Sequence, residues 1–142
     1  MPQFELTHAT TVAIGGRGVL ISGPSGSGKS DLALRLIDRG GALVSDDQTL
    51  LRVVAGQVVA SAPATIAGML EVRGLGIVPV AQAQEAPLRL CVALGDAEER
   101  LPGPRTREVM GVKLPEIVLD PRPASAPIKV ELALADPGLA IA

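Results

Sequence analysis

The segment GPSGSGKS at residues 23–30 restricts the possible folds of this chain more than any other stretch. It matches the pattern G-x-x-x-x-G-K-[ST], follows the apolar run VLIS and precedes SDLALRLIDRG, so the required strand and helix flank it. Glycines let successive backbone N–H groups point at phosphate oxygens, and the start of the helix adds a partial positive charge. The sequence therefore predicts a phosphate-binding loop made of Gly23, Pro24, Ser25, Gly26, Ser27, Gly28, Lys29 and Ser30.

Two side chains of this loop indicate its ligands. Lys29 supplies a point charge for the β- and γ-phosphates of a nucleotide, and the hydroxyl of Ser30 is a ligand for Mg²⁺. The loop thus predicts ATP and Mg²⁺ as cofactors, but it leaves open what becomes of the phosphate.

An acidic pair, Asp46 and Asp47, ends the next expected strand, ALVSDD. If this strand runs parallel to the strand before the loop, its C-terminal end lies beside the phosphates. One carboxylate would then hold Mg²⁺, directly or through water, and the other would accept a proton from an attacking hydroxyl. Which Asp has which role is open, and a polar strand end without chemistry is the alternative.

Strand patterns outnumber helix patterns along the chain. We expect a short strand before Gly15–Gly16, a strand at 18–22, a helix at 29–39, a strand at 42–47, a hairpin turning at Ala55–Gly56, a short helix at 64–72 that ends by Gly74, and strands at 75–80, 88–95, 112–120 and 127–134. This order predicts one α/β P-loop domain with a mixed β-sheet over residues 1–142.

Composition excludes several classes of partner. The 142 residues include one Phe, no Tyr and no Trp, and the formal net charge is −2. Aromatic platforms and a basic footprint are both missing, so we expect no nucleic-acid partner. A bound base has Phe4 as its one aromatic candidate for stacking.

Three features of the sequence bear on localisation. The N-terminus lacks a signal-peptide pattern, and no apolar run is long enough to span a membrane. The single Cys91 fits a buried thiol in a reducing compartment, so we expect a cytoplasmic protein.

Further segments stand in a fixed order around the loop. His8 precedes the loop's strand, SDD occupies residues 45–47, LEVRGLGIV occupies 70–78 and MGVKLPEIVLDPRP occupies 110–123. With these segments the chain resembles the catalytic domain of bacterial HPr kinase/phosphorylase. The resemblance implies a fold akin to the nucleotide domain of phosphoenolpyruvate carboxykinase. Members of that family usually carry an N-terminal domain, whereas this chain begins almost at the catalytic core.

The resemblance also implies an activity and a partner. Members phosphorylate a serine of HPr, the phosphocarrier of the sugar phosphotransferase system, at the expense of ATP, and they also remove that phosphate by phosphorolysis. They commonly form hexamers, so we expect a homo-oligomer. Two alternatives stay open: a small-molecule P-loop kinase with residues 98–108 as a lid, and a nucleotide-sensing module without transfer activity.

Roles for acidic residues and the histidine follow from the resemblance. Asp46 or Asp47 would be the general base, and Glu71 would join Ser30 at Mg²⁺. His8 is the single histidine of the chain, and it would orient one of the two aspartates.

Arginine roles follow in the same way. Arg73 and Arg100 would neutralise charge on the transferring phosphoryl group. Arg122 lies in the loop that the family uses for phosphorolysis. After Arg122 and Pro123, however, this chain reads Ala-Ser-Ala at 124–126 where the family has Gly-Arg-Asn. The sequence therefore predicts the kinase reaction more firmly than the reverse one.

Overall fold

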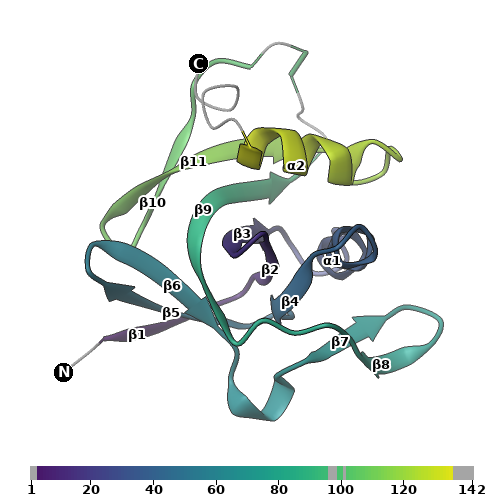
Figure 1. Cartoon of the computed structure of the whole chain (residues 1–142). Coiled ribbons are helices and arrows are strands. Elements are labelled where there is room, and N and C mark those ends of the chain that lie inside the picture. The colour runs from purple at the N-terminus through teal and green to yellow at the C-terminus, as the bar shows by residue number, and fades with distance from the viewer. Residues whose placement is uncertain (1–2, 96–98, 101, 136–142) are drawn as a thin grey trace.

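Strand β9 (Glu85–Leu94) connects the two parts of the main β-sheet (Figure 1). Its first residues pair antiparallel with β6 (Gln57–Ser61), and its later residues pair parallel with β3 (Arg17–Ser22) and β11 (Val112–Leu119). This computed structural model describes residues 3–95, 99–100 and 102–135, over which the strand order is β1-β5-β6-β9-β3-β2-β4, with β11 on β9 and β10 on β11. The α/β fold with a mixed sheet is confirmed.

The other elements, in chain order, are β1 (Phe4–Thr7), β2 (Thr10–Ile14), α1 (Lys29–Asp38), β4 (Ala42–Ser45), β5 (Thr49–Val54), a 3₁₀ turn (Ala64–Ile66), β7 (Met69–Val72), β8 (Gly76–Pro79), β10 (Thr106–Val109) and α2 (Ala126–Ala135). Strands β7 and β8 form a separate two-stranded sheet. Neither described α-helix is long and apolar enough to cross a membrane.

The direction of β4 decides where the acidic pair lies. Strand β2 pairs antiparallel with both β3 and β4, so β4 runs in the same direction as β3 although β2 separates them. Both strands therefore end at one edge of the sheet. This edge carries the phosphate loop after β3 and Asp46 and Asp47 after β4, as the sequence pattern suggested.

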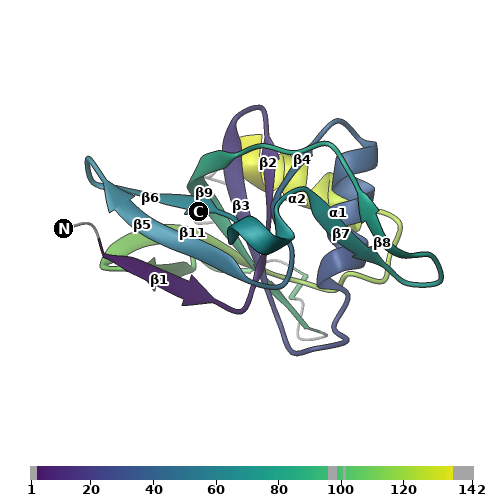
Figure 2. The same cartoon turned by 90° about the horizontal axis from the view of Figure 1, so that it is seen from below.

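Hydrophobic clusters on both faces hold β3 in place. Val19 and Ile21 point toward α1 and α2, which cover one face of the sheet (Figure 2). Leu20 points to the other face, where it belongs to a cluster with Cys91 and Leu114. All of these side chains are less than 8% exposed. A strand buried on both faces gives the loop at its end a rigid base.

Two sequence-based assignments were wrong. Residues 69–72 were expected to be helical but form β7, because Gly68 (φ +74°) ends the 3₁₀ turn and Met69–Val72 pairs with Gly76–Pro79. Residues 127–134 were expected to be a strand but belong to α2. Buried side chains there recur at helical spacing, at Ala126, Val130, Ala133 and Leu134, and Pro127 is tolerated in the first turn of a helix.

Candidate active site

The phosphate loop joins β3 to α1, and two of its glycines have a left-handed backbone. Gly26 has φ +80° and Gly28 has φ +103°, so a side chain at either position would strain the loop. Lys29 is the first residue of α1, and its Nζ donates hydrogen bonds to the carbonyl oxygens of Gly23 (2.8 Å) and Pro24 (3.1 Å). The ammonium group therefore lies against the loop that binds phosphates.

A pocket of about 520 Å³ opens beside the loop, and we name it the Asp47 pocket. It is lined by Ser25, Gly26, Gly28, Lys29, Ser30, Asp31, Leu34, Asp47, Glu71, Val72 and Arg73. Three segments that are distant in sequence meet here: the loop with α1, the turn after β4, and the end of β7 with the residue that follows it. The pocket thus combines the cations of a phosphate site, Lys29 and Arg73, with three carboxylates.

Asp46 is fixed by hydrogen bonds and is 8% exposed. Its Oδ1 accepts from the hydroxyls of Ser30 (2.7 Å) and Thr10 (3.1 Å), and its Oδ2 accepts from the backbone N–H of Glu71 (3.0 Å). Both carboxylate oxygens are therefore engaged by neighbouring groups of the protein. This arrangement suits a residue that positions Ser30 and β7.

Asp47 has the opposite environment. Its side chain is 61% exposed, lines the pocket, and places Oδ1 2.6 Å from Nε2 of His8. The backbone at Asp47 is left-handed (φ +65°), a conformation that Asp tolerates better than most residues. The left-handed turn separates the two adjacent carboxylates: one is buried under the loop and the other is presented to the pocket.

Thr10 is a site residue that the sequence did not reveal. It is fully buried on β2, and its Oγ1 donates to Asp46 Oδ1 and accepts from the backbone N–H of Asp47 (3.0 Å). One hydroxyl therefore holds both aspartates of the pair. A buried threonine in a strand has no sequence signature that would distinguish this role from packing.

The residues around Ser30 fit Mg²⁺. The Ser30 hydroxyl lies 2.7 Å from Asp46, and Glu71 lines the same pocket as Ser30. A hydroxyl and carboxylates, the hard oxygen ligands that this ion prefers, are therefore available at this site. Within the described part of the chain, no group of three or more His, Cys, Asp and Glu side chains could hold a metal by itself. Phosphate oxygens and water would therefore complete the coordination of a bound ion.

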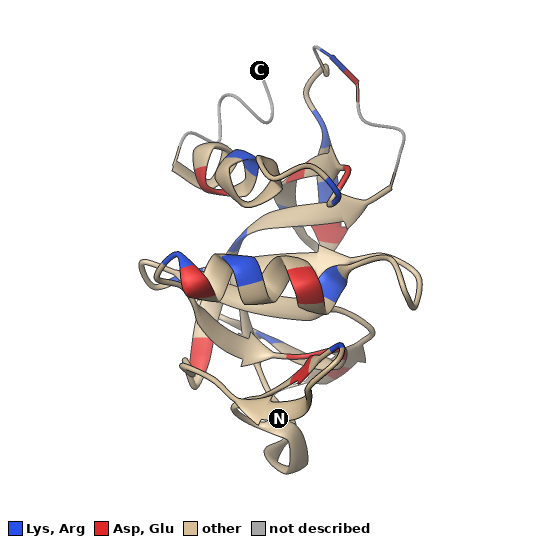
Figure 3. Cartoon of the chain, turned by 90° about the vertical axis from the view of Figure 1, so that its right-hand side faces the viewer, with Lys and Arg blue, Asp and Glu red and all other residues tan. Residues whose placement is uncertain are grey.

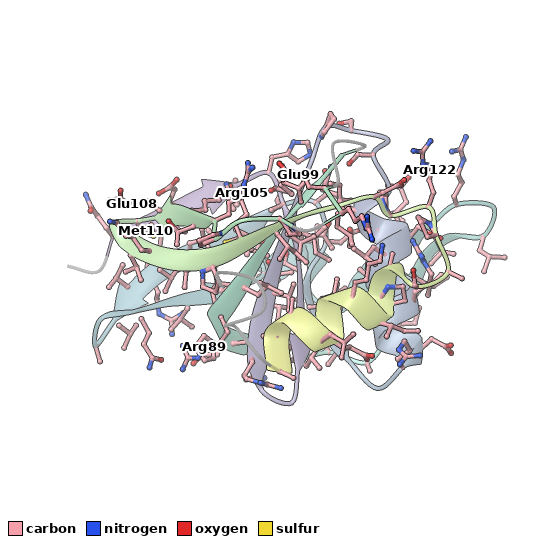
Figure 4. All side chains as sticks on the ribbon, turned by 90° about the horizontal axis from the view of Figure 1, so that it is seen from above. Arg89, Glu99, Arg105, Glu108, Met110 and Arg122 are labelled. Carbon is pink, nitrogen blue, oxygen red and sulfur yellow. The ribbon has the colours of Figure 1, made fainter. Side chains whose placement is uncertain are left out.

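The predicted arginines lie in different places. Arg73 follows β7 and lines the Asp47 pocket. Arg100 is exposed and is not among the described residues that line this pocket. Arg122 precedes α2 and points outward, well apart from Glu99 and Arg105 (Figure 4). The structure therefore brings Arg73, but neither Arg100 nor Arg122, to the pocket lining.

A second cavity, of about 480 Å³, lies on the other side of the loop, and we name it the Arg122 groove. Its lining consists of Gly26, Ser27, Gly28, Asp31, Arg35, Pro121, Arg122 and Ala124. It shares Gly26, Gly28 and Asp31 with the Asp47 pocket. The two cavities therefore meet at the N-terminus of α1.

Charge pairing stabilises the segment that borders this groove. Asp120 accepts hydrogen bonds from the guanidinium of Arg122 (2.9 and 3.0 Å) and from its backbone N–H (3.0 Å), and these bonds lower the pKa of the Asp120 carboxyl.

The single cysteine lies away from both cavities' linings. Burial raises the pKa of the Cys91 thiol to about 11, which agrees with the expected unreactive thiol.

Comparison with known proteins gives one consistent family. A family model described as "HPr Serine kinase C-terminal domain" matches residues 1–131. HPr kinase/phosphorylases from Clostridium tetani and Clostridium beijerinckii are each 49% identical over 79 residues, which is 56% of this chain and 26% of each relative. The chain thus matches about a quarter of the length of these curated relatives.

A solved structure extends the match to nearly the whole chain. The HPr(Ser) kinase/phosphatase structure from Coxiella burnetii superposes with a TM-score of 0.81 at 30% sequence identity, covering 95% of this chain and 97% of that one. The likeness therefore extends over nearly the whole α/β fold.

Proposed function

This chain belongs to the HPr serine kinase C-terminal domain family, and from that premise we propose that it transfers the γ-phosphoryl group of ATP to a serine of an HPr-type phosphocarrier protein. The serine oxygen forms a bond to the γ-phosphorus while the bond from that phosphorus to the β,γ-bridging oxygen breaks. ADP leaves, and the proton of the serine hydroxyl passes to a carboxylate of the enzyme.

The environments of the two aspartates are the observation that carries this proposal. Asp47 is exposed in the pocket with Lys29 and Ser30, and His8 binds one of its oxygens. Asp46 is buried with both oxygens engaged. A base must reach the acceptor hydroxyl, so the geometry favours Asp47 as the base and leaves Asp46 to position Ser30.

The remaining roles follow from position in the pocket. His8 orients Asp47, and its imidazole lies 2.6 Å from the carboxylate that receives the proton. Lys29 and Arg73 offset negative charge on the phosphates. Ser30, Asp46 and Glu71 would hold Mg²⁺, which when bound offsets charge on the β- and γ-phosphates. Arg100, exposed on its segment, is proposed to approach the phosphoryl group when the acceptor protein binds.

We propose that phosphorolysis is the weaker activity of this chain. The family's Gly-Arg-Asn is replaced by Ala-Ser-Ala at 124–126. In addition, Arg122 directs its guanidinium to Asp120 and lines the groove on the far side of the loop from Asp47. Incubation with serine-phosphorylated HPr and inorganic phosphate measures this reaction, and we expect a rate well below that of phosphorylation.

A hexameric assembly stays a prediction, which light scattering would test.

The test of the proposal is transfer from γ-labelled ATP to purified HPr in the presence of Mg²⁺. We expect label on one serine of HPr and none on an HPr variant in which that serine is alanine. Unlabelled HPr, together with intact ATP binding, would contradict the kinase proposal and favour a nucleotide-sensing module. Full activity of the double variant Asp46→Asn, Asp47→Asn would contradict the mechanism.

A further inference from the structure

We propose that the Arg122 groove binds the nucleoside part of ATP, so that the donor and acceptor lie on opposite sides of the phosphate loop. The inference rests on the proposed function, because it places the acceptor serine at Asp47. It adds a binding site for the base and ribose, and it identifies Arg122 and Pro121 as groups that recognise them.

In-line displacement dictates the direction of the nucleotide. The attacking oxygen, the γ-phosphorus and the leaving oxygen are roughly collinear, so the leaving ADP must point away from the base that receives the proton. Asp47 lines one cavity and not the other. With the acceptor serine at Asp47 and the phosphates at Lys29, the nucleoside extends across the N-terminus of α1 to the other side.

The Arg122 groove lies on that side. It meets the Asp47 pocket at Gly26, Gly28 and Asp31, so a polyphosphate chain bound at the loop passes from one cavity to the other without leaving the protein surface. The volume of about 480 Å³ falls within the range of about 300–1,000 Å³ that is typical of ligand sites.

A long-range contact builds the groove. Arg35 on α1 donates from Nη2 to the carbonyl oxygen of Pro121 (2.6 Å) and from Nη1 to that of Pro123 (3.3 Å), and it also pairs with Asp31 (3.1 Å). A Cβ atom placed on Gly28 would lie 3.4 Å from Cγ of Pro121. The segment before α2 is therefore held against the phosphate loop, as a preformed wall requires.

The chemistry of this wall suits a flat base. The chain has no Tyr or Trp, and its single Phe4 lies on β1, away from α1 (Figure 1). Arginine guanidinium planes stack on aromatic rings and substitute for aromatic platforms. Asp120 holds the Arg122 guanidinium with two hydrogen bonds, which fixes the plane on which a base could stack.

The test compares ATP with inorganic tripolyphosphate, which has the same phosphates and no nucleoside. For Arg122→Ala we expect the Kd of Mg·ATP to rise by about tenfold, in line with the loss of one stacking partner, and the Kd of tripolyphosphate to change by less than about twofold. Calorimetric titration of the full chain measures both without an acceptor protein. Failure of the kinase proposal and failure of this inference are therefore distinguishable.

Two further variants make the result specific. Arg52→Ala removes an arginine on β5 that pairs with Glu85 and should change neither Kd. Val72→Ala probes the rival location, the apolar end of the Asp47 pocket near Leu34. A selective loss of ATP affinity in Val72→Ala, with none in Arg122→Ala, would overturn the proposal.

Photolabelling with 8-azido-ATP gives a readout that does not depend on substitution. After irradiation and trypsin digestion, we expect label on the peptide of residues 114–129, which contains the wall of the groove. Label on the peptide of residues 53–73, which contains Glu71 and Val72 of the Asp47 pocket, would overturn the proposal.

Discussion

The two cavities beside the phosphate loop differ in how they are built. The Asp47 pocket collects charged side chains from the ends of β4 and β7, each close to a recognisable motif. The Arg122 groove depends on Arg35 and the carbonyl oxygens of Pro121 and Pro123. Acidic and basic residues alternate along α1, which runs from this junction (Figure 3). Sequence motifs therefore mark the charged residues of the Asp47 pocket, whereas a contact between distant parts of the chain shapes the Arg122 groove.

The largest expected effect concerns Asp47, in the cavity that we assign to the acceptor serine. Asp47→Asn should lower kcat by about 10²–10⁴-fold, the usual contribution of a general base, and should leave the Kd of ATP unchanged. Asn is also tolerated in the left-handed conformation found at Asp47 (φ +65°), so stability should stay within about 0.5 kcal/mol of the parent. Single-turnover transfer to HPr measures the first effect.

The control for this prediction is Asp38→Asn, at an exposed carboxylate at the end of α1. It should leave kcat unchanged. A kcat for Asp47→Asn equal to that of the control would show that Asp47 is not the general base. This role would then no longer distinguish the Asp47 pocket from the Arg122 groove.

The neighbouring aspartate should respond differently. Asp46→Asn replaces an oxygen that accepts from Ser30, Thr10 or Glu71 with an amide donor. An unsatisfied buried group costs about 1–3 kcal/mol, so the free energy of unfolding should fall by that amount, and the affinity for Mg·ATP should fall with it. Urea unfolding and calorimetry measure both. Unaltered stability would show that the three hydrogen bonds do not hold Asp46.

Much of the Asp47 pocket could be predicted from sequence, because its parts are local. The loop GPSGSGKS and the SDD strand end are each a few residues long, and the position of SDD beside the loop follows once its strand runs parallel to β3. Glu71, within LEVRGLGIV, was assigned to the site through the family resemblance, and it lies on β7 of a separate two-stranded sheet. What failed was the assignment of Met69–Val72 and of residues 127–134. Four residues such as MLEV suit a helix or a strand equally well, and pairing with β8 decided the outcome.

The Arg122 groove could not be predicted in this way. Arg35 and Pro121 are 86 residues apart, and an arginine on a surface helix resembles any other solvated cation in the sequence. Thr10 presents the same difficulty, since its role depends on Asp46 lying 36 residues later in the chain. Such contacts arise from the packing of α1 and β2 on the folded sheet and have no local pattern.

A smaller effect is expected when the wall of the groove is loosened. Arg35→Lys keeps the positive charge near Asp31 but cannot reach the carbonyl oxygens of Pro121 and Pro123 together. We expect about a threefold rise in the Kd of Mg·ATP and no change for tripolyphosphate. Equal losses for both ligands would mean that Arg35 supports the phosphate loop instead of the nucleoside wall.

The smallest expected effect concerns Asp120. Its hydrogen bonds from Arg122 hold its pKa below the ordinary value of 3.8, so the stability that they contribute is present above that pH and is lost as the pH falls through the native pKa. In Arg122→Ala the Asp120 pKa should return toward its ordinary value. A carboxyl-detected NMR titration checks this, and an unchanged pKa would show that Arg122 is not the cause.

A crystal structure with Mg²⁺ and a non-hydrolysable ATP analogue tests the division of the two cavities most directly. We predict the γ-phosphate at Lys29 on the Asp47 side of the loop, and the base against Arg122 and Pro121. A base stacked near Val72 and Leu34, with the Arg122 groove unoccupied by ligand, would contradict the account.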